Sequence, residues 1–377
     1  MSTPTQTKKK AAREREAARA KRKAEREAAR NGKAGAKGGK RKEGWKETLR
    51  FWGWAILIVL VVRAFLVEPF RIPTPSMEDT LLVGDFLFVS KVHYGARTPN
   101  TICVPFIGKP CLPGVELPQT RLPGFSEVKR GDVAVFNYPP ETGPIERRTP
   151  YIKRLVGMPG DTVRLLDKVL YVGGERYLLS ETQQQWWEVS PSGNAGVPRA
   201  RVEEAGADLL GPVPNTNRVI VTATPQAAEA LRALPYVASV EGYAFPEGQR
   251  TDGIFPAGSG FNRDNYGPLA VPKAGETVAL TAASWPVLRE VITRHEGHQA
   301  EALADGRFRI DGEIADSYTF AQDYYFAMGD NRDNSQDSRF WGFVPHDHLV
   351  GKAVLVFFSL DTERFFLPRL RGLQPIR

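Results

Sequence analysis

A run of apolar residues constrains the fold of this chain more than any other feature. Twelve uncharged residues, Phe51 to Val62, precede Arg63, and four further apolar residues extend the run to Val67. As a helix rising 1.5 Å per residue, these 17 residues span about 26 Å, which suits a bilayer core of about 30 Å once flanking side chains snorkel. Three tryptophans precede or begin the run, as is typical of a membrane interface. We therefore predict one membrane-spanning anchor within residues 46–68, in preference to a buried core helix or a cleaved secretory signal.

Positive charge is concentrated just before this segment. Residues 1–50 contain 18 lysines and arginines and six acidic residues, so they carry +12 of a chain whose net charge is +8, and the remainder carries −4. Because positive flanks stay in the cytoplasm, this asymmetry predicts a cytoplasmic N-terminus and an exported body. The mildly acidic body argues against nucleic-acid binding.

Residues 8–42, within the basic arm of residues 1–45, have almost no large apolar side chains and so cannot pack a core. Their first half is rich in Ala, Lys, Arg and Glu and is able to form a solvated helix. We expect a disordered basic arm, the alternative being an arm that contacts anionic lipid head groups.

The rest of the chain reads as short strands separated by Gly and Pro. The composition is 42% hydrophobic, enough for a core, and two cysteines exclude a disulfide-dense mini-protein. Strand-like runs occupy residues 81–92, 132–140, 151–174 and 350–360, and helix-like spacing occupies residues 225–234 and 283–297. We predict a mostly β body in two parts, residues 69–174 and 321–377, interrupted by an α+β insertion at residues 175–320.

The two cysteines, Cys103 and Cys111, are separated by seven residues. Outside the cytoplasm they either close a small disulfide loop or remain free thiols, and the sequence leaves both alternatives open. Neither belongs to a Cys-x-x-Cys motif, so a bridge would be structural.

Polar residues able to take part in catalysis are concentrated in a few segments. Three prolines in residues 69–81 hold Ser76 on a stiff, extended element next to the membrane segment. Strand alternation puts Lys153 and Leu155 on one face, so the lysine is able to point inward. Residues 328–345 are dense in Asp, Asn, Arg and Ser. Each segment also has an ordinary structural interpretation, as a loop serine, an outward lysine or a hydrogen-bonded turn.

Together these segments resemble the bacterial type I signal peptidases (leader peptidases), membrane-anchored Ser/Lys endopeptidases that remove secretory signal peptides. The matching motifs are I-P-T-P-S-M, Y-I-K-R-L-V-G-M-P-G-D and G-D-N-R-D-N-S-Q-D-S-R-F-W-G, in the family's order after an anchor. The resemblance is close over residues 65–95, 129–166 and 322–353 and looser over 262–276, whereas residues 175–255 match no motif.

The resemblance implies a signal-peptidase-like β-fold and no cofactor or metal. It implies cleavage of signal-peptide-bearing preproteins after small residues at −1 and −3. The expected location is the bacterial inner membrane, crossed once, with the phospholipid bilayer as a partner. Which preproteins are cut, the oligomeric state and the role of residues 175–320 stay open.

By the same resemblance, Ser76 is the expected nucleophile and Lys153 the general base. The Ser76 backbone N–H and the Thr74 hydroxyl form the expected oxyanion hole, and Ser335 is expected to hydrogen-bond and orient the lysine. Asp337 and Arg339 match a supporting charged pair. The side chains expected to line the substrate pockets are Phe70, Ile72, Leu81, Tyr151 and Ile152.

A lysine is a base only when it is neutral. Its reference pKa of about 10.4 must fall by two or more units, which burial among apolar side chains achieves. The residues expected to form that apolar surrounding are Met77, Phe136, Ile152 and Leu155. A Ser/Lys pair is a known variant of the Ser-His-Asp arrangement.

Other chemistries use the histidines. A Ser-His-Asp set would recruit His346 or His348 with Asp337, and H-x-x-H at residues 295–298 or H-x-H at residues 346–348 would begin a zinc site. We interpret all five histidines, His93 and His298 included, as exposed loop residues.

Two further classes share some of these features. The self-cleaving repressors share the Ser/Lys chemistry, but they are cytoplasmic proteins with a DNA-binding domain, which a membrane span argues against. A scaffold that has lost activity would bind exported chains without cutting them.

Overall fold

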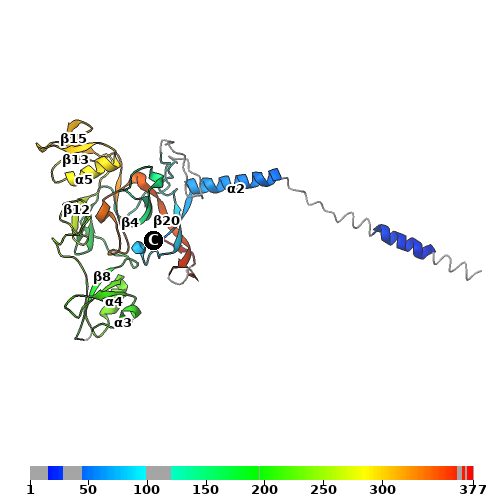
Figure 1. Cartoon of the computed structure of the whole chain (residues 1–377), viewed down its shortest axis with the longest axis horizontal. Helices are drawn as coiled ribbons and strands as arrows, with labels where there is room; N and C mark the ends of the chain where they lie inside the picture. The colour runs from blue at the N-terminus through cyan, green and yellow to red at the C-terminus, as the bar shows by residue number, and fades with distance from the viewer. Residues whose placement is uncertain are drawn as a thin grey trace, which may run out of the picture. The chain divides into compact units, whose positions relative to one another are not determined.

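The computed structural model describes residues 16–28, 45–98, 120–194, 196–362, 367–369 and 372–376. The chain separates into two compact units, residues 1–58 and 59–377, whose boundary falls within the long helix drawn in Figure 1. Residues 16–28 are helical with every side chain exposed, the solvated helix that the sequence allows in the first half of the basic arm. Cys103 and Cys111 lie outside the described residues, so their pairing stays an open alternative.

Helix α2 (Trp45–Phe65) corresponds to the predicted anchor. Among the described residues it is the one helix long and apolar enough to cross a membrane, and none of its residues is buried. The helix ends at Phe65 and strand β1 begins at Val67, so the last residues of the predicted 46–68 span belong to the strand. Lys91 joins this end of the helix to the body, because its ammonium donates to the Ala64 carbonyl at 3.3 Å.

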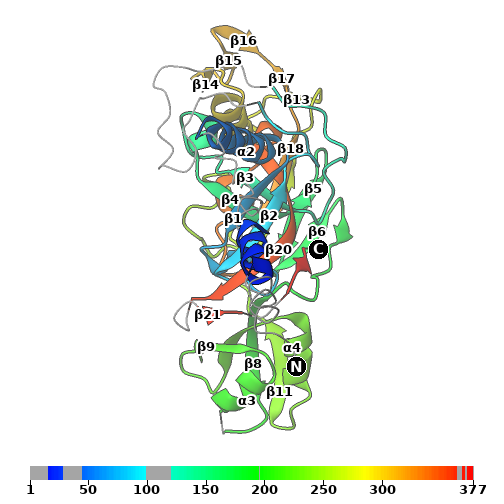
Figure 2. The same cartoon turned by 90° about the vertical axis from the view of Figure 1, so that its right-hand side faces the viewer.

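The body is built around one nine-stranded antiparallel sheet (Figure 2). In spatial order its strands are β1 (Val67–Arg71), β2 (Asp85–Ser90), β20 (Leu349–Asp361), β3 (Val133–Asn137), β4 (Pro150–Gly157), β18 (Tyr324–Met328) and β19 (Val344–Pro345), and β21 (Leu367–Pro368) and β22 (Gln374–Pro375) also pair with β20. Four of these strands, β2, β20, β3 and β4, coincide with predicted runs, and the other five do not. Because β20 lies between β2 and β3, the two predicted parts of the body build a single sheet.

Four short helical turns lie in the connections between these strands. They are η1 (Pro75–Met77), η2 (Ile145–Arg147), α6 (Ser338–Trp341) and η4 (His346–His348). Two of them, η1 and α6, contain or follow residues that the sequence marks as functional.

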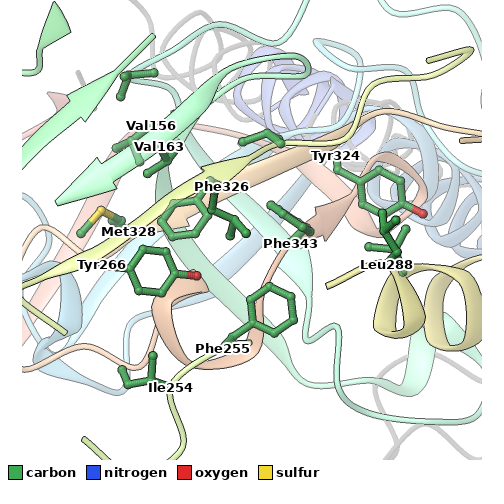
Figure 3. Packing of buried hydrophobic residues seen from close by; sticks show 14 of the residues in the cluster. Val156, Val163, Ile254, Phe255, Tyr266, Leu288, Tyr324, Phe326, Met328 and Phe343 are labelled. Atoms are coloured by element: carbon green, nitrogen blue, oxygen red, sulfur yellow. The ribbon is translucent and has the colours of Figure 1, made fainter. Parts of the chain in front are cut away.

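A second sheet continues from β4 and shares a large aromatic core with the first. Its strands, in spatial order, are β12 (Tyr266–Ala270), β5 (Thr162–Leu166), β6 (Val169–Val172) and β7 (Glu175–Arg176). The turn expected at residues 159–161 forms with Gly160 at φ +87°, in the left-handed region that glycine tolerates best. Figure 3 shows Tyr266, Phe326 and Phe343 packed in the shared core.

Residues 275–320 add small hairpins and a helix against that core. The strands are β13 (Thr277–Ala279), β14 (Ala300–Ala302), β15 (Phe308–Ile310), β16 (Glu313–Ala315) and β17 (Ser317–Thr319). Helix α5 (Trp285–Glu290) continues into a π-helical turn, η3 (Val291–His295), which confirms the helix expected within residues 283–297. Leu288, Val291 and Ile292 bury its apolar face in the shared core.

Residues 185–242 form a separate βαββαβ module. In chain order its elements are β8 (Gln185–Pro191), α3 (Arg199–Glu204), β9 (Asp208–Pro212), β10 (Val219–Ala223), α4 (Pro225–Arg232) and β11 (Val237–Gly242). The antiparallel strand order is β11-β8-β10-β9, the split βαβ arrangement of ferredoxin-like folds. Val189, Val221 and Leu231 belong to its own core, so the insertion mixes helix and strand as predicted.

Candidate active site

Ser76 lies at the centre of the 3₁₀ turn η1, directly after β1. Thr74 is the extended residue that enters the turn, with φ −132° and ψ 152°, and Pro75 begins it. The side chains of Met77 and Leu81 are fully buried below the turn and anchor it to the sheet. The prolines and the apolar anchors thus leave Ser76 with little freedom to move, at 8% exposure.

Lys153 reaches this serine from the middle of β4. Its ammonium donates to Ser76 Oγ at 2.7 Å and to the Ile152 carbonyl oxygen at 2.9 Å, and its side chain lies over the Tyr151 ring at 5.5 Å. Lys153 is 3% exposed and Leu155 is fully buried, which confirms that both point inward.

The surroundings of Lys153 depress its basicity. Burial lowers the pKa of Lys153 to about 8, against a partial raising of that pKa by the negative charges of Asp337 and Asp330. All four apolar residues expected around it are present in the two clusters that flank the site. Met77 and Ile152 belong to one cluster, and Phe136 and Leu155 to the other. Near pH 8 this lysine is therefore neutral in about half of the molecules.

The Thr74 hydroxyl oxygen lies 3.5 Å from Ser76 Oγ, on the exposed side of the turn. Thr74 makes no side-chain capping bond to η1. A hydroxyl in this position is within reach of a group bound at Ser76.

Asp337 and Arg339 form a buried, bidentate ion pair. Arg339 Nη2 lies 2.8 Å from Asp337 Oδ2, and Arg339 Nε lies 2.9 Å from Oδ1. Asp337 also caps α6 and accepts a hydrogen bond from the Gly329 N–H at 3.1 Å. The pair therefore ties α6 to the loop that follows β18.

Ser335 departs from the expectation. The predicted hydrogen bond to Lys153 is absent within the described residues, where Ser335 Oγ is buried without a hydrogen-bond partner. The ammonium of Lys153 is instead held by Ser76 and Ile152, while Ser335 packs over Gly329. A Cβ added at Gly329 would stand 2.2 Å from Ser335 Oγ.

Several residues next to the site were missed by the sequence reasoning. Arg154 donates from Nε and Nη2 to the two oxygens of Asp330, at 2.8 and 2.6 Å, in a fully buried pair. Asn331 donates from its backbone N–H to the Ser76 carbonyl oxygen at 3.1 Å. The available signals were an arginine directly after Lys153 and the polar density of residues 328–345.

The predicted substrate-binding residues divide into two groups. Ile72 and Leu81 are almost fully buried, so they form the floor beneath the site, while Phe70 and Ile152 pack against them and remain partly exposed. Tyr151 lies on the other side, stacked on Tyr138 with ring centroids 4.4 Å apart.

The interpretation of the histidines as exposed loop residues is wrong. His348 is 4% exposed, and its ring nitrogens bond to Asp347 at 2.8 Å and to Arg148 at 2.6 Å. The other four histidines are partly buried. His346 bonds to Tyr325 at 3.0 Å. These partners keep both histidines away from a Ser-His-Asp set, since Asp337 is paired with Arg339.

Zinc was the other alternative for the histidines. Across the described part of the chain, no group of three or more His, Cys, Asp or Glu side chains is placed to hold a metal ion.

A serine hydroxyl bonded to a desolvated lysine, on a mostly antiparallel β body, is the geometry of the Ser/Lys class of hydrolases. Comparison with protein families gives a match to the signal peptidase family, peptidase S26, over residues 45–216 and 288–358. The two matched segments skip residues 217–287, which include the second half of the βαββαβ module.

Individual relatives agree with this match. A signal peptidase I of Pseudomonas aeruginosa is 32% identical over 317 residues, which cover 81% of this chain and 69% of that protein. A signal peptidase I of Helicobacter pylori is 26% identical over 317 residues, 83% of this chain and 82% of that protein. A solved signal peptidase I from Enterococcus faecalis is similar at 16% identity over 60% of this chain and 97% of that one, but its TM-score of 0.22 is too low to support any conclusion.

The chain therefore belongs to the signal peptidase family, peptidase S26. It is an enzyme that hydrolyses peptide bonds to remove signal peptides, and its substrates are the preproteins that carry them.

Proposed function

We propose that this chain is a membrane-bound serine endopeptidase that cleaves signal peptides with Ser76 as nucleophile and Lys153 as general base. The observation that carries the proposal is the 2.7 Å contact between Lys153 Nζ and Ser76 Oγ, with both residues buried. The lowered pKa of Lys153, about 8, supplies a substantial neutral fraction at mildly alkaline pH.

The reaction proceeds in two halves. Neutral Lys153 takes the proton of Ser76 Oγ while that oxygen attacks the scissile carbonyl carbon, and the Ser76 N–H and Thr74 hydroxyl stabilise the oxyanion. The tetrahedral intermediate expels the amine of the mature protein, which takes the proton from the Lys153 ammonium. Water then attacks the acyl-enzyme, Lys153 accepts its proton, and the Oγ–carbon bond breaks as Ser76 recovers a proton.

Ser335, Asp337 and Arg339 have supporting roles in this proposal. The ion pair fixes the loop after β18 through the Gly329 N–H, and Ser335 packs against Gly329 of that loop. None of the three exchanges a proton with substrate.

The substrate lies extended beside the site with small side chains at −1 and −3. An extended segment pairs with strand edges through its main chain, and shallow pockets for alternate side chains give selectivity. Phe70, Ile72, Leu81, Tyr151 and Ile152 bound these pockets, with Ile72 and Leu81 as the floor.

The anchor is part of the mechanism. Helix α2 spans the bacterial inner membrane once, the basic residues before it stay in the cytoplasm, and the body faces the exported side. Residues 69–174 and 321–377 form the catalytic core and residues 175–320 the inserted subdomain. Tethering at the membrane raises the effective concentration of the site where the apolar part of a signal peptide ends, which offsets weak binding by shallow pockets.

The test uses the full chain in detergent with a purified preprotein. Wild type is compared with Ser76→Ala and Lys153→Met, and Ser126→Ala and Lys129→Met are matched controls from the β2–β3 connection. N-terminal sequencing of the product locates the cut. Cleavage after a small residue by wild type and both controls, but by neither site variant, supports the proposal. Equal cleavage by Ser76→Ala or Lys153→Met overturns the dyad.

Protease protection tests the orientation. In spheroplasts, external protease should digest the body and spare the basic residues before α2. Protection of the body from external protease would overturn the proposed topology.

A further inference from the structure

The loop that follows β18, residues 329–332, lies between two other segments. On one side it touches η1, where Asn331 donates from its backbone to the Ser76 carbonyl oxygen at 3.1 Å and from its side chain to the Pro75 carbonyl oxygen at 3.3 Å. On the other side it pairs with residues 180–184, which we call the entry segment because they lead into the βαββαβ module. The Gln184 N–H donates to the Asp330 carbonyl oxygen at 2.9 Å, and the Arg332 N–H donates to the Gln184 carbonyl oxygen at 2.9 Å.

The carboxylate of Asp330 is the buried centre of this arrangement. Its Oδ1 accepts from Arg154 Nε at 2.8 Å and from Gln183 Nε2 at 2.9 Å, and its Oδ2 accepts from Arg154 Nη2 at 2.6 Å and from Thr80 Oγ1 at 2.7 Å. Four donors satisfy both oxygens of a carboxylate that is fully shielded from solvent. Arg154 directly follows Lys153, and Thr80 lies four residues after Ser76. Asp330 therefore fixes the strand of the base relative to the turn of the nucleophile.

The entry segment supplies two parts of this network. Gln183 is fully buried, and its Oε1 accepts from the Ser180 N–H at 2.8 Å, which leaves Nε2 to face Asp330. Thr182 Oγ1 lies 2.7 Å from Thr80 Oγ1. Because Thr80 gives its only hydroxyl proton to Asp330, Thr182 must be the donor in that contact.

We propose that Gln183, assisted by Thr182, is a positioning residue for the Ser76–Lys153 pair and acts through Asp330 and Thr80. The inference rests on the proposed Ser/Lys function. It gives the start of the inserted subdomain a part in positioning the Ser76–Lys153 pair, because hydrogen bonds from Gln183 and Gln184 couple the insertion to the loop that carries Asp330.

The consequences of losing the Gln183 amide follow from its position. One lone pair of a buried carboxylate would be left without a donor, so the loop and the Thr80 turn would readjust, and a nucleophile displaced by about 1 Å loses up to about a hundredfold in rate. The Asp330 charge would also be less compensated. Since that charge raises the pKa of Lys153, the lysine would stay protonated to a higher pH.

The experiment measures kcat, KM and the pH dependence of preprotein cleavage by the full chain in detergent. Gln183→Met keeps the length of the side chain and removes the donor, and Gln185→Met is the matched control, since Gln185 pairs with Ala223 inside the module. For Gln183→Met we expect kcat to fall about tenfold with KM nearly unchanged, and the acid limb of the pH–rate profile to move to higher pH. The Gln185→Met control should match wild type in both.

A merely structural role would reduce the amount of folded enzyme without moving the acid limb, and that result overturns the proposal. So does a Gln183→Met variant that matches wild type. If Gln183→Met does not fold, Thr182→Val provides the test, because Thr182 is partly exposed. We expect Thr182→Val to lose less kcat than Gln183→Met and to show the same movement of the acid limb to higher pH. A Thr182→Val variant that matches wild type overturns the proposal. If the pH–rate profile of the wild type does not depend on Lys153, the Ser/Lys function and this inference both fail. If the profile does depend on Lys153 but the Gln183 and Thr182 variants cleave like wild type, this inference alone fails.

Discussion

Gly329 is the position where a single added carbon should damage catalysis most selectively. A Cβ built there would lie 2.2 Å from Ser335 Oγ, 2.5 Å from Ser335 Cβ and 2.6 Å from the Ser76 carbonyl oxygen. Real Cβ contacts essentially never fall below 3.0 Å, so Gly329→Ala requires a displacement of about 0.8 Å or more between this loop and its neighbours. Ser335 has little room to yield, because it is itself buried, at 8% exposure.

The displacement falls on the reacting groups. Ser76 shares its carbonyl contact with this loop, and its Oγ must keep the 2.7 Å distance to Lys153 Nζ. A shift of about 1 Å at a reacting atom costs up to about a hundredfold, so we expect Gly329→Ala to lower kcat about 10- to 100-fold. Overpacking should also lower the free energy of unfolding by about 1–3 kcal/mol.

Two glycine controls separate these effects. Gly157→Ala produces a similar clash away from the site, with Val163 Cγ2 at 2.7 Å and Phe326 Cβ at 2.9 Å, so it should lower the melting temperature without a selective loss of kcat. Gly211→Ala meets nothing within 4 Å and should leave both quantities unchanged. The assay is steady-state cleavage of a preprotein in detergent, with thermal unfolding followed by circular dichroism. The reasoning is refuted if Gly329→Ala retains the wild-type kcat, or if its loss per folded molecule equals that of Gly157→Ala.

Three further outcomes follow from the contacts described above. In the proposed mechanism protonated Lys153 is inactive, and its pKa is about 8, so kcat/KM should rise about tenfold between pH 7 and pH 9. A limb centred below pH 7 would contradict the assignment of the base. Arg154→Met leaves the Asp330 carboxylate buried without its cation, so it should lower the free energy of unfolding by about 3–5 kcal/mol, measured by denaturant titration. A loss under about 1 kcal/mol, as for a surface ion pair, would contradict a buried network. Thr224→Ala removes the hydroxyl that caps α4 through the Ala227 N–H and should destabilise that helix by about 1 kcal/mol, seen as faster hydrogen exchange within residues 185–242, with cleavage unaffected.

The apolar helix and some of the strands were predictable because they depend on local patterns. An apolar run long enough for a bilayer and a cluster of positive charge are both contiguous in sequence, and they led to α2 (Trp45–Phe65). Strand alternation showed only that Lys153 was able to point inward, and its burial in the structure confirms that it does. What failed was the environment of isolated residues: five histidines looked like loop residues, yet His348 is buried against Arg148, which lies 200 residues away, and His346 bonds to Tyr325.

The network around Asp330 was not predictable from the sequence. Thr80, Arg154, Gln183 and Asp330 are spread over 250 residues, and nothing in their local sequence shows that they share one carboxylate. Such a set becomes visible only when β4, the turn after Ser76 and the entry segment are packed against one loop. The βαββαβ module was likewise expected only as a mixture of helix and strand, since strand order depends on pairing between distant segments.

The sequence by itself determined an apolar segment long enough to cross a membrane, the charge asymmetry, the β-rich body and the residue types able to carry Ser/Lys chemistry, because hydrophobic length, charge and periodicity are properties of neighbouring residues. Only the tertiary structure decided that Lys153 Nζ lies 2.7 Å from Ser76 Oγ, that Ser335 packs on Gly329 instead of bonding to the lysine, and that the insertion is tied to the site through Gln183. The physical reason is that burial and hydrogen-bond partners are set by long-range packing, in which a displacement of about 1 Å separates an effective catalytic pair from an ineffective one.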